Sequence, residues 1–280
     1  MFSHLNRSVQ QSAFALLALC TFNFQSKAQS NPLPKPRHRF TVIAHRGDHV
    51  KFPENTLEAY AEAIKNGVDY VEIDLRTTRD SALVSMHDGA VDRVTNGKGQ
   101  IKDLTLAEIK QLEVKSRDSL DKKTYHIPTF EEILKLCKSR IYIYIDFKNA
   151  SAFAVYQMLL KFGMEKQVIV YINSEEQLKQ WRKAAPAMPL MLSLPGNVKT
   201  AEKLEEFLSN AKPDLLDGDW KDYTPEVVKM VHEHHLQIWP DVQSHDEDEH
   251  WDSALSLGFD GLQTDHPAAL IKHLKEKEVR

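Results

Sequence analysis

Residues 72–88, EIDLRTTRDSALVSMHD, decide how the strands of this chain are counted. Short runs of β-branched and apolar residues alternate along the chain with stretches of helical periodicity. These strand-like runs cover residues 40–44, 70–75, 82–87, 141–147, 167–172, 189–194, 214–219, 236–240 and 260–265. Only residues 76–81 separate the second run from the third, whereas about a dozen residues are needed to connect two parallel strands. The second and third runs therefore form a hairpin that turns near Arg79, and eight parallel strands remain.

The stretches between the strands have the periodicity of helices. Residues 56–67, TLEAYAEAIKNG, begin with a threonine and end on a glycine, as helices often do. Other stretches open with Ser or Thr followed by an acid in the first turn. This alternation predicts the α/β class with a parallel sheet, and eight such units close into a (β/α)8 TIM barrel. The polar segment 88–128 is expected to form a small loop and helix insertion over the C-terminal mouth of the barrel.

The first 28 residues differ in kind from the rest of the chain. Arg7 precedes an apolar run at residues 13–22, and Ser26 and Ala28 offer the small side chains of a cleavage site. This layout is typical of a secretory signal peptide, and the apolar run is too short to span a bilayer. We therefore expect residues 1–28 to be a signal peptide and the protein to be periplasmic or secreted, with no transmembrane segment in the mature chain.

Two cysteines and a Pro-rich stretch bear on how the mature chain is organised. Cys20 would be the anchor of a lipoprotein, but the bulky Leu19 before it makes lipoprotein anchorage the less favoured alternative. The stretch 29–38 indicates a linker, which leaves residues 39–275 as one domain. Cys137 is then the only cysteine of the mature chain, so the fold has no internal disulfide and must depend on its core.

Charge and composition exclude some classes of partner. The chain has 36 Lys and Arg against 40 Asp and Glu, a formal net charge of -4, and no basic stripe stands out. This balance gives no support to a nucleic-acid partner. The composition is that of an ordinary globular protein and leaves the oligomeric state open.

Acidic side chains interrupt two of the predicted strands. Glu72 and Asp74 are two residues apart in one strand, so their side chains lie on the same side of it. Asp146 and Lys148 end a long apolar strand in the same way. Converging buried carboxylates are costly unless they are paired or bind a cation, and a hard divalent ion such as Ca²⁺ or Mg²⁺ suits them. The alternative is a strand end that simply reaches solvent.

Histidines end two further strands. His45 and Arg46 follow the first apolar run, and His87 follows the third. In parallel barrels the active site lies at the C-terminal ends of the strands, so four polar strand ends indicate one site. Two histidines can give and take a proton, and an arginine can bind phosphate oxygens with its planar fork. The chemistry that these residues favour is phosphoryl transfer.

The stretch HRGDHVKFPENTLEAYAEAIKNGVDYVEIDLRTTRDSALVSMHD, residues 45–88, resembles the signature of the glycerophosphodiester phosphodiesterase family. DRVTNGKGQIKDLTLAEIKQL, HIPTFEEIL, IDFK and GFDGLQTDHP resemble that family in order and spacing, so the likeness covers about residues 40–270. It implies a (β/α)8 barrel over the domain at 39–275 and metal-dependent hydrolysis of small glycerophosphodiesters to glycerol 3-phosphate and an alcohol.

The resemblance also implies roles for individual residues. His45 and His87 become the catalytic acid–base pair, and the substrate is bound by Arg46, Lys148, Glu54 and Trp239. Glu54 is expected to orient Arg46 or to touch the glycerol, and Trp239 either walls the site or simply packs in the protein. One divalent cation, Ca²⁺ or Mg²⁺, would be held by Glu72, Asp74 and Asp146.

This sequence departs from the family pattern at two places. The third metal position usually carries Glu, and Asp146 is one methylene shorter. The late Trp-Thr-x-Asn pattern is replaced by IWPDVQS, in which Trp239 remains but Pro240 and Val242 stand at polar positions. The alcohol-side specificity is therefore open. A lysophospholipase D-like activity on lysophospholipids is one alternative, and a non-catalytic barrel that binds phosphate esters is another.

Overall fold

The computed structural model describes residues 32–280 except residues 117 and 119. The expected signal peptide at 1–28, with Cys20, lies outside the described residues, as does the start of the expected linker at 29–38.

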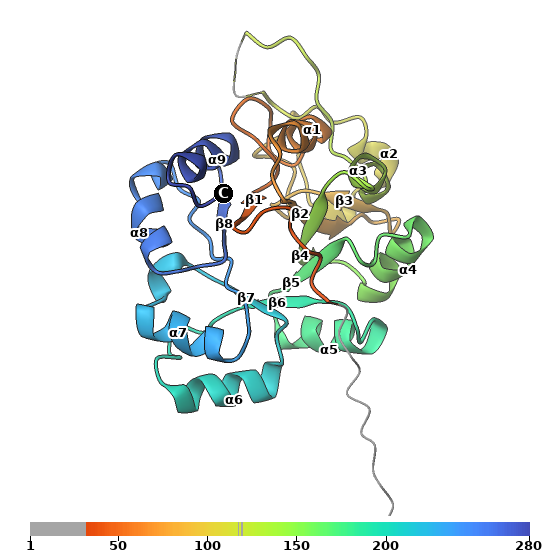
Figure 1. The fold of residues 1–280 in the computed structure, drawn as a ribbon. Coiled ribbons are helices and arrows are strands. Elements are labelled where there is room, and N and C mark those ends of the chain that lie inside the picture. Colours follow the sequence, from red (N-terminus) through yellow and green to blue (C-terminus); the bar gives the residue numbers. More distant parts are fainter. Residues whose placement is uncertain (1–31, 117, 119) are drawn as a thin grey trace, which may run out of the picture.

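Parallel strands form a sheet that curves round on itself, with helices outside it (Figure 1). The order around the sheet is β7-β6-β5-β4-β2-β1-β8. In chain order these strands are β1 (Thr41–Ala44), β2 (Tyr70–Thr77), β4 (Tyr142–Asn149), β5 (Val168–Ile172), β6 (Leu190–Ser193), β7 (Leu215–Asp217) and β8 (Gly261–Thr264). β3 (Leu83–Ser85) pairs antiparallel with β2, with Leu75 opposite Ser85 and Thr77 opposite Leu83. The hairpin expected from residues 72–88 is confirmed.

The run predicted at 236–240 fills the eighth position of the barrel without forming a regular strand. Isolated parallel bridges join Ile238 to Leu216 on one side and Asp241 to Gln263 on the other. The Trp239 amide donates to the Leu216 carbonyl at 2.9 Å, and the Gln263 amide donates to the Pro240 carbonyl at 3.0 Å. Pro240 has no amide hydrogen to give, which interrupts the ladder at this point. These bonds close the ring, so the (β/α)8 barrel is confirmed.

The helices cover the outer face of the barrel (Figure 1). They are α1 (Leu57–Asn66), α3 (Phe130–Cys137), α4 (Ala152–Phe162), α5 (Glu175–Ala184), α6 (Ala201–Ala211), α7 (Pro225–Glu233), α8 (Trp251–Ser256) and α9 (Pro267–Glu276), with short 3-10 turns at Ile101–Asp103, Trp220–Asp222 and Glu247–Glu249. α1 begins where the sequence predicts, because the Thr56 side chain caps the amide of Ala59, and it ends at Gly67 in the left-handed region (φ 76°). Within the described part of the chain, no helix has the length and apolar character needed to cross a membrane.

Two apolar layers support the barrel. The larger lies between the sheet and the outer helices and includes Cys137, which is buried as its helical spacing predicts. The smaller fills the barrel interior and is formed by Ile43, Tyr70, Tyr144, Ile169, Met191, Leu215 and Trp239, one inward side chain from each of seven strand positions. This interior layer is the floor on which the polar strand ends stand.

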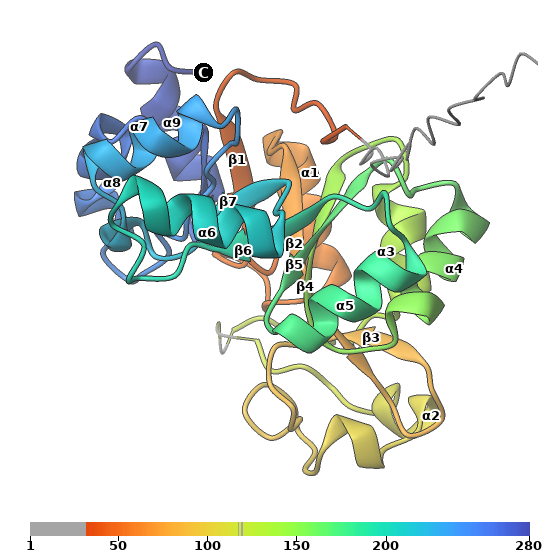
Figure 2. The same cartoon turned by 90° about the horizontal axis from the view of Figure 1, so that it is seen from below.

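The insertion at 88–128 has a small core of its own. Val91, Ile101, Ile109 and Tyr125 are among its buried side chains, and they pack against Val84 of β3. Its helix, α2 (Leu106–Ile109), is short and opens with a capping box between Thr105 and Glu108. Figure 2 shows β3 and α2 projecting from one end of the barrel, while the N-terminal described segment lies at the opposite end.

Residues outside the expected domain boundaries pack against that opposite end. The Tyr70 hydroxyl donates to the Pro34 carbonyl at 2.8 Å, so residues of the expected linker lie against the barrel. Arg280, beyond the expected boundary at 275, pairs with Asp69 at 2.5 Å, and the two side chains are 1% and 0% exposed. This arginine is therefore anchored by a buried carboxylate.

Breaking that pair should destabilise the fold measurably. Arg280→Ala leaves Asp69 buried without its guanidinium, and we expect a loss of about 3 kcal/mol in the free energy of unfolding in urea. Lys277→Ala is the matched control, since Lys277 pairs with Asp252 at an exposed site and should change stability by less than about 1 kcal/mol. Equal effects of the two changes would contradict the structural role of Arg280.

Candidate active site

A cavity of about 350 Å³ opens at the C-terminal ends of the barrel strands. His45, Arg46, Glu72, His87 and Asp146 line it, so residues predicted from separate strand ends do meet at one place. Tyr144 of the interior layer also reaches it.

The three predicted metal ligands lie together. Each of Glu72, Asp74 and Asp146 offers a carboxylate oxygen, and these oxygens lie within 4.8 Å of one another. Asp74 and Asp146 are register partners on β2 and β4, and Glu72 precedes Asp74 on the same face. The shorter Asp146 therefore still reaches the group. Burial, then the charges of Asp74 and Asp146, raise the pKa of Glu72 well above its ordinary value. Three mutually repelling hard oxygen donors fit a divalent cation such as Ca²⁺ or Mg²⁺.

Lys148 lies beside this triad. Its ammonium nitrogen is 3.2 Å from Asp74 Oδ1 and also bonds Asp146. Burial alone would lower the pKa of Lys148, but the charges of Asp74 and Asp146 outweigh it and raise the pKa above its ordinary value. The lysine is thus a fixed positive charge next to the cavity, as a phosphate-binding residue must be.

His45 is held by a carboxylate to which the sequence assigned no role. His45 Nδ1 is 2.7 Å from Asp265 Oδ1, just after β8. Because a carboxylate only accepts, Nδ1 carries the hydrogen, and Nε2 is left without it in the neutral ring. Burial alone would raise the pKa of Asp265, but the hydrogen bond and charge of His45, with His49 and Arg46 nearby, lower it.

Glu247 fixes the backbone at Asp265, just after β8. Its side chain is fully buried and accepts from the Asp265 amide at 2.9 Å and from the His266 amide at 3.1 Å. The sequence favours a capping box between Ser244 and Glu247; this is wrong, because the Glu247 carboxylate turns inward to the end of β8. The segment TDHP belongs to the family resemblance, but no local signal shows that its aspartate would face His45.

His87 has the same arrangement as His45. The Met86 amide donates to the Asp74 carbonyl at 2.9 Å, which fixes His87 beside the triad. His87 Nδ1 is 2.9 Å from Asp88 Oδ1. The hydrogen bond from Arg93 is the main reason that the pKa of Asp88 falls to about 2, so this partner is a stable carboxylate. Both histidines therefore have a carboxylate on Nδ1, and both rings line the cavity.

Arg46 is bent into place by its backbone. It adopts a left-handed conformation (φ 53°), and its amide donates to Glu72 Oε2 at 2.7 Å. Gly47 follows at φ 81°, where a Cβ would come within 2.8 Å of the Ala59 backbone, so only glycine fits there. Strand β1 therefore stops and turns back tightly against α1.

The PENT segment supplies the supports for these groups. Glu54 bonds Arg46 at 3.1 Å and Arg93 at 2.7 Å. Burial would raise the pKa of Glu54, but the Arg93 hydrogen bond and the charges of Arg46 and Arg93 bring it to about 2. Asn55 donates to Asp74 Oδ2 at 2.8 Å, a contact that the sequence alone did not reveal. Of the two expectations for Glu54, the contacts match the one in which it orients Arg46.

Trp239, a predicted substrate-binding residue, does not line the cavity. It is fully buried in the interior layer, with its ring centroid 5.0 Å from that of Tyr70. Inward side chains alternate along a strand, so Trp239 occupies the floor and Asp241, two residues later, lines the cavity. Packing, the alternative left open from the sequence, is what the structure shows.

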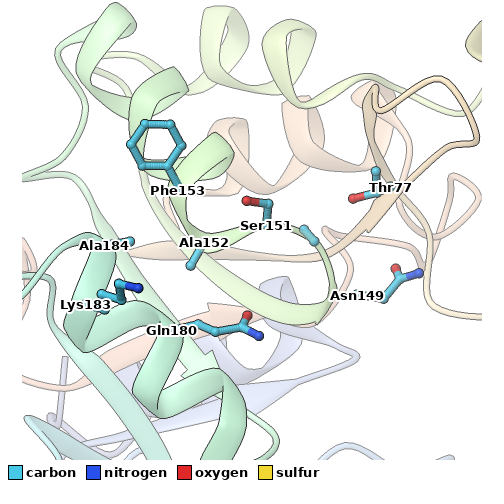
Figure 3. A pocket seen from close by; sticks show the side chains of 9 residues that line it. Thr77, Asn149, Ser151, Ala152, Phe153, Gln180, Lys183 and Ala184 are labelled. Carbon is cyan, nitrogen blue, oxygen red and sulfur yellow. The ribbon is translucent and has the colours of Figure 1, made fainter.

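A larger groove of about 780 Å³ lies between α4 and α5 on the outside of the barrel (Figure 3). Phe153 and Lys183 line it, and no acid or histidine does. Its size therefore does not make it the catalytic site, because the groups that could carry phosphoryl chemistry lie in the smaller cavity.

Asp265→Asn should show whether Asp265 positions His45 for catalysis or only supports the fold. We expect kcat to fall by about 10²–10³-fold and its pH profile to shift, because the amide no longer fixes the tautomer and charge of His45. Asp252→Asn is the matched control, since Asp252 also bonds a histidine, His273, but at an exposed surface. Steady-state kinetics across pH check this, and an unchanged profile in Asp265→Asn would remove Asp265 from the site.

The barrel and its site define a class of protein. A triad for a divalent cation, two histidines with carboxylate partners, and Arg46 and Lys148 for phosphate oxygens together suit the cleavage of a phosphodiester. Comparison with known proteins narrows this class. Residues 45–269 match the glycerophosphoryl diester phosphodiesterase family.

Individual proteins resemble this chain in sequence or in fold. A glycerophosphodiester phosphodiesterase of Caldanaerobacter subterraneus subsp. tengcongensis is 30% identical over 252 residues, covering 84% of this chain and 98% of the relative. A glycerophosphodiester phosphodiesterase structure from Agrobacterium tumefaciens has a TM-score of 0.72 at 24% identity, over 82% of this chain and 99% of that one. A phosphodiesterase of Oleispira antarctica, solved with the product sn-glycerol-3-phosphate, has a TM-score of 0.71 at 20% identity, over 84% and 96%.

The chain belongs to the glycerophosphoryl diester phosphodiesterase family. It is therefore an enzyme that hydrolyses phosphodiesters, which leaves no support for the alternative of a non-catalytic barrel.

Proposed function

We propose that this enzyme hydrolyses small glycerophosphodiesters to glycerol 3-phosphate and an alcohol, with His45 and His87 as acid and base and one divalent cation, Ca²⁺ or Mg²⁺, at the acidic triad. The observation that carries the proposal is the paired arrangement of the histidines. Each has a carboxylate on Nδ1, and both line the cavity that Glu72 and Asp146 also line.

The residues of the chain divide the work in a simple way. Arg46 and Lys148 bind phosphate oxygens and fix the phosphorus between the two rings. One histidine takes the proton of the attacking glycerol hydroxyl at Nε2, and the other gives a proton to the oxygen of the departing alcohol, which leaves a cyclic phosphate. Water then opens the cyclic phosphate to glycerol 3-phosphate, and this step returns both histidines to their starting protonation states. Glu72, Asp74 and Asp146 would hold a divalent cation, which would supply further positive charge to stabilise the phosphate in the transition state. Glu54, Asn55 and Asp265 hold these groups in position.

One assay tests the activity and its metal dependence. The purified mature chain is incubated with glycerophosphocholine and glycerophosphoethanolamine, with and without a chelator, and glycerol 3-phosphate is detected enzymatically. With Ca²⁺ and Mg²⁺ supplied in turn, we expect product with at least one of the two ions, and loss of product with chelator. If no glycerophosphodiester gives chelator-sensitive product, the proposal is wrong.

We also propose that the protein is exported to the periplasm or secreted. The support is the order of charge, apolar run and small residues within residues 1–28. N-terminal sequencing of the chain recovered from its host should find Gln29 first. An intact Met1 on the mature protein would contradict export by cleavage, and a lipidated Cys20 would show lipoprotein anchorage instead.

The groove between α4 and α5 favours a second candidate, a lysophospholipase D-like reaction. Phe153 is 63% exposed there, and the groove begins at Asn149, next to Lys148. An acyl chain could lie on such a surface. Phe153→Ser should then lower activity on lysophosphatidylcholine and spare that on glycerophosphocholine. Leu160→Ser, on the same helix and also exposed, is the control. Absence of turnover with any lysophospholipid would exclude this candidate.

A further inference from the structure

The wall of the cavity opposite the acidic triad is also polar, and the proposed reaction does not use it. In the closed ring, β2 and β4 carry the triad, while β7, the 238–241 position and β8 lie across from them. From that far side Asp217, Asp241, Gln243 and Gln263 line the cavity. Asp217 and Asp241 stand one layer above Leu215 and Trp239 of the floor, two residues further along the chain in each case.

This far wall presents hydrogen-bond acceptors that have no partner among the described residues. Asp217 Oδ2 accepts from the Tyr144 hydroxyl at 2.6 Å, but Asp217 Oδ1 accepts from nothing. Gln263 donates its amide to Asp241, which leaves its own Oε1 unpaired, and Gln243 Oε1 is unpaired too. Asp217 is 1% exposed and Gln263 is 4% exposed, so bulk solvent does not reach these groups easily. Buried acceptors without partners are rare and indicate a ligand or ordered water.

The charge of the wall further limits the chemical class of the ligand. Asp217 and Asp241 are close enough that burial first, and then the charge of Asp241, raise the pKa of Asp217 well above its ordinary value. The unpaired oxygens of Asp217, Gln243 and Gln263 therefore lack hydrogen-bond donors. The two carboxylates of the wall also suit a positive charge in addition to that of His45, which already acts on Asp241. A primary ammonium group offers both, since it carries one charge and three N–H donors. A quaternary ammonium group has the charge but no donor, and a neutral polyol has donors but no charge.

The position of the wall fits the alcohol side of the substrate. Arg46, Lys148 and the triad suit the phosphate at one side of the cavity, so a group esterified to that phosphate can reach the other side. The two carboxylates of the wall suit a charged alcohol group better than the uncharged glycerol. We propose that Asp217, Asp241, Gln243 and Gln263 form a subsite for a primary ammonium on the alcohol group, which makes glycerophosphoethanolamine the preferred substrate. This inference rests on the proposed function and adds to it the head group that the sequence left open.

A matched substrate series tests the subsite. We would measure kcat/KM for glycerophosphoethanolamine, its stepwise N-methylated forms up to glycerophosphocholine, and the uncharged glycerophosphoethanol. The expected result is a preference of about 10–10²-fold for the primary ammonium over glycerophosphocholine and over glycerophosphoethanol. Each added methyl group removes one donor and should lower kcat/KM in steps.

Variants connect the preference to the residues. Asp217→Asn keeps the shape and the bond from Tyr144 but removes the charge, so the ratio of glycerophosphoethanolamine to glycerophosphoethanol should fall toward one. Asp241→Asn serves as a second variant if Asp217→Asn folds poorly. Asp222→Asn removes an exposed carboxylate in the loop after β7, outside the cavity, and should leave the ratio unchanged.

The outcomes separate this inference from the proposed function. Turnover of glycerophosphodiesters without an ammonium preference, or with a preference for a polyol head group, would overturn the subsite and leave the proposed function standing. So would an equal loss on all substrates in both variants, or two bound ions per wild-type chain with one in Asp217→Asn, since the wall would then be structural or a cation site. No turnover of any member of the series contradicts the proposed function itself, and the subsite with it.

Discussion

His87→Ala is expected to lower kcat for a glycerophosphodiester by about 10²–10⁴-fold, the contribution of a well-placed general acid or base. The ring is fixed on one side by Asp88, which Arg93 keeps ionised, and on the other side it faces the cavity. Alanine removes the group that carries the proton and leaves these neighbours intact. Since the His87 side chain is 38% exposed, the change should not disturb the core.

The choice of substrate reveals which histidine is the acid. A p-nitrophenyl phosphodiester of glycerol has a leaving group that departs without a proton. The variant of the acid should therefore recover most of its activity on that substrate, whereas the variant of the base should not. His45→Ala and His87→Ala are compared in this way. We expect one to be rescued and the other to stay slow, because the proposed mechanism gives the two rings different tasks.

The control for these measurements is a histidine of the insertion. His126 is exposed, bonds the Leu112 carbonyl and does not line the cavity. His126→Ala should leave kcat unchanged and the free energy of unfolding in urea within about 0.5 kcal/mol of wild type. If His87→Ala is as active as this control while remaining folded, His87 has no part in the chemistry.

The fold was accessible from the sequence because its signals are local. Six residues between two strand-like runs exclude a parallel crossover, and this count alone identified the hairpin of β2 and β3. The run at 236–240 was predicted as an ordinary strand, yet Pro240 leaves only isolated bridges there. The sequence shows the proline, but the bonds that compensate for it come from Leu216 and Gln263, which are distant in the chain.

The candidate site also contains residues that could be predicted from the sequence and residues that could not. Glu72, Asp74 and Asp146 were found because charged residues interrupt apolar strands, a pattern visible in one segment at a time. Asp265 was missed because its importance comes from a bond to His45, 220 residues away in the chain. Asp217 was missed for the same reason. In the sequence it is only an acid near the end of the predicted strand at 214–219, and its place in the cavity depends on closure of the ring. Partners brought together by closure of the barrel leave no periodic signal in a single sequence.

Glu72→Gln should reduce kcat by about 10³-fold, which corresponds to the several kcal/mol that a bound cation contributes to transition-state stabilisation. Glutamine has the same shape and can still accept from the Arg46 amide, which bonds Glu72 Oε2 at 2.7 Å in the wild type. It removes one of the three charges that a cation needs. The loss should persist at any Ca²⁺ or Mg²⁺ concentration that saturates the wild-type enzyme.

Stability measurements distinguish a lost cation from a damaged fold. In the wild type, saturating the triad at a hundred times Kd should add about 2.7 kcal/mol to the free energy of unfolding, and this gain should shrink in Glu72→Gln. With chelator, where no cation is bound, we expect Glu72→Gln to be more stable than the wild type. Burial and the neighbouring acids raise the pKa of Glu72 above its ordinary value of 4.5, so the folded state resists its ionisation. Glu72 therefore contributes a loss of stability to the wild type as the pH rises above about 4.5, and Glu72→Gln lacks this contribution.

The difference between the two chains without a cation is thus expected to grow with pH in favour of the variant. Urea unfolding of both proteins in chelator, at several pH values from about 4.5 to 8, measures it directly. A variant that is less stable than the wild type in chelator at about pH 8 would show that Glu72 supports the fold through its hydrogen bonds. A variant that keeps the full cation-induced gain would show that the ion is held without Glu72, and the triad would then be wrong as a metal site.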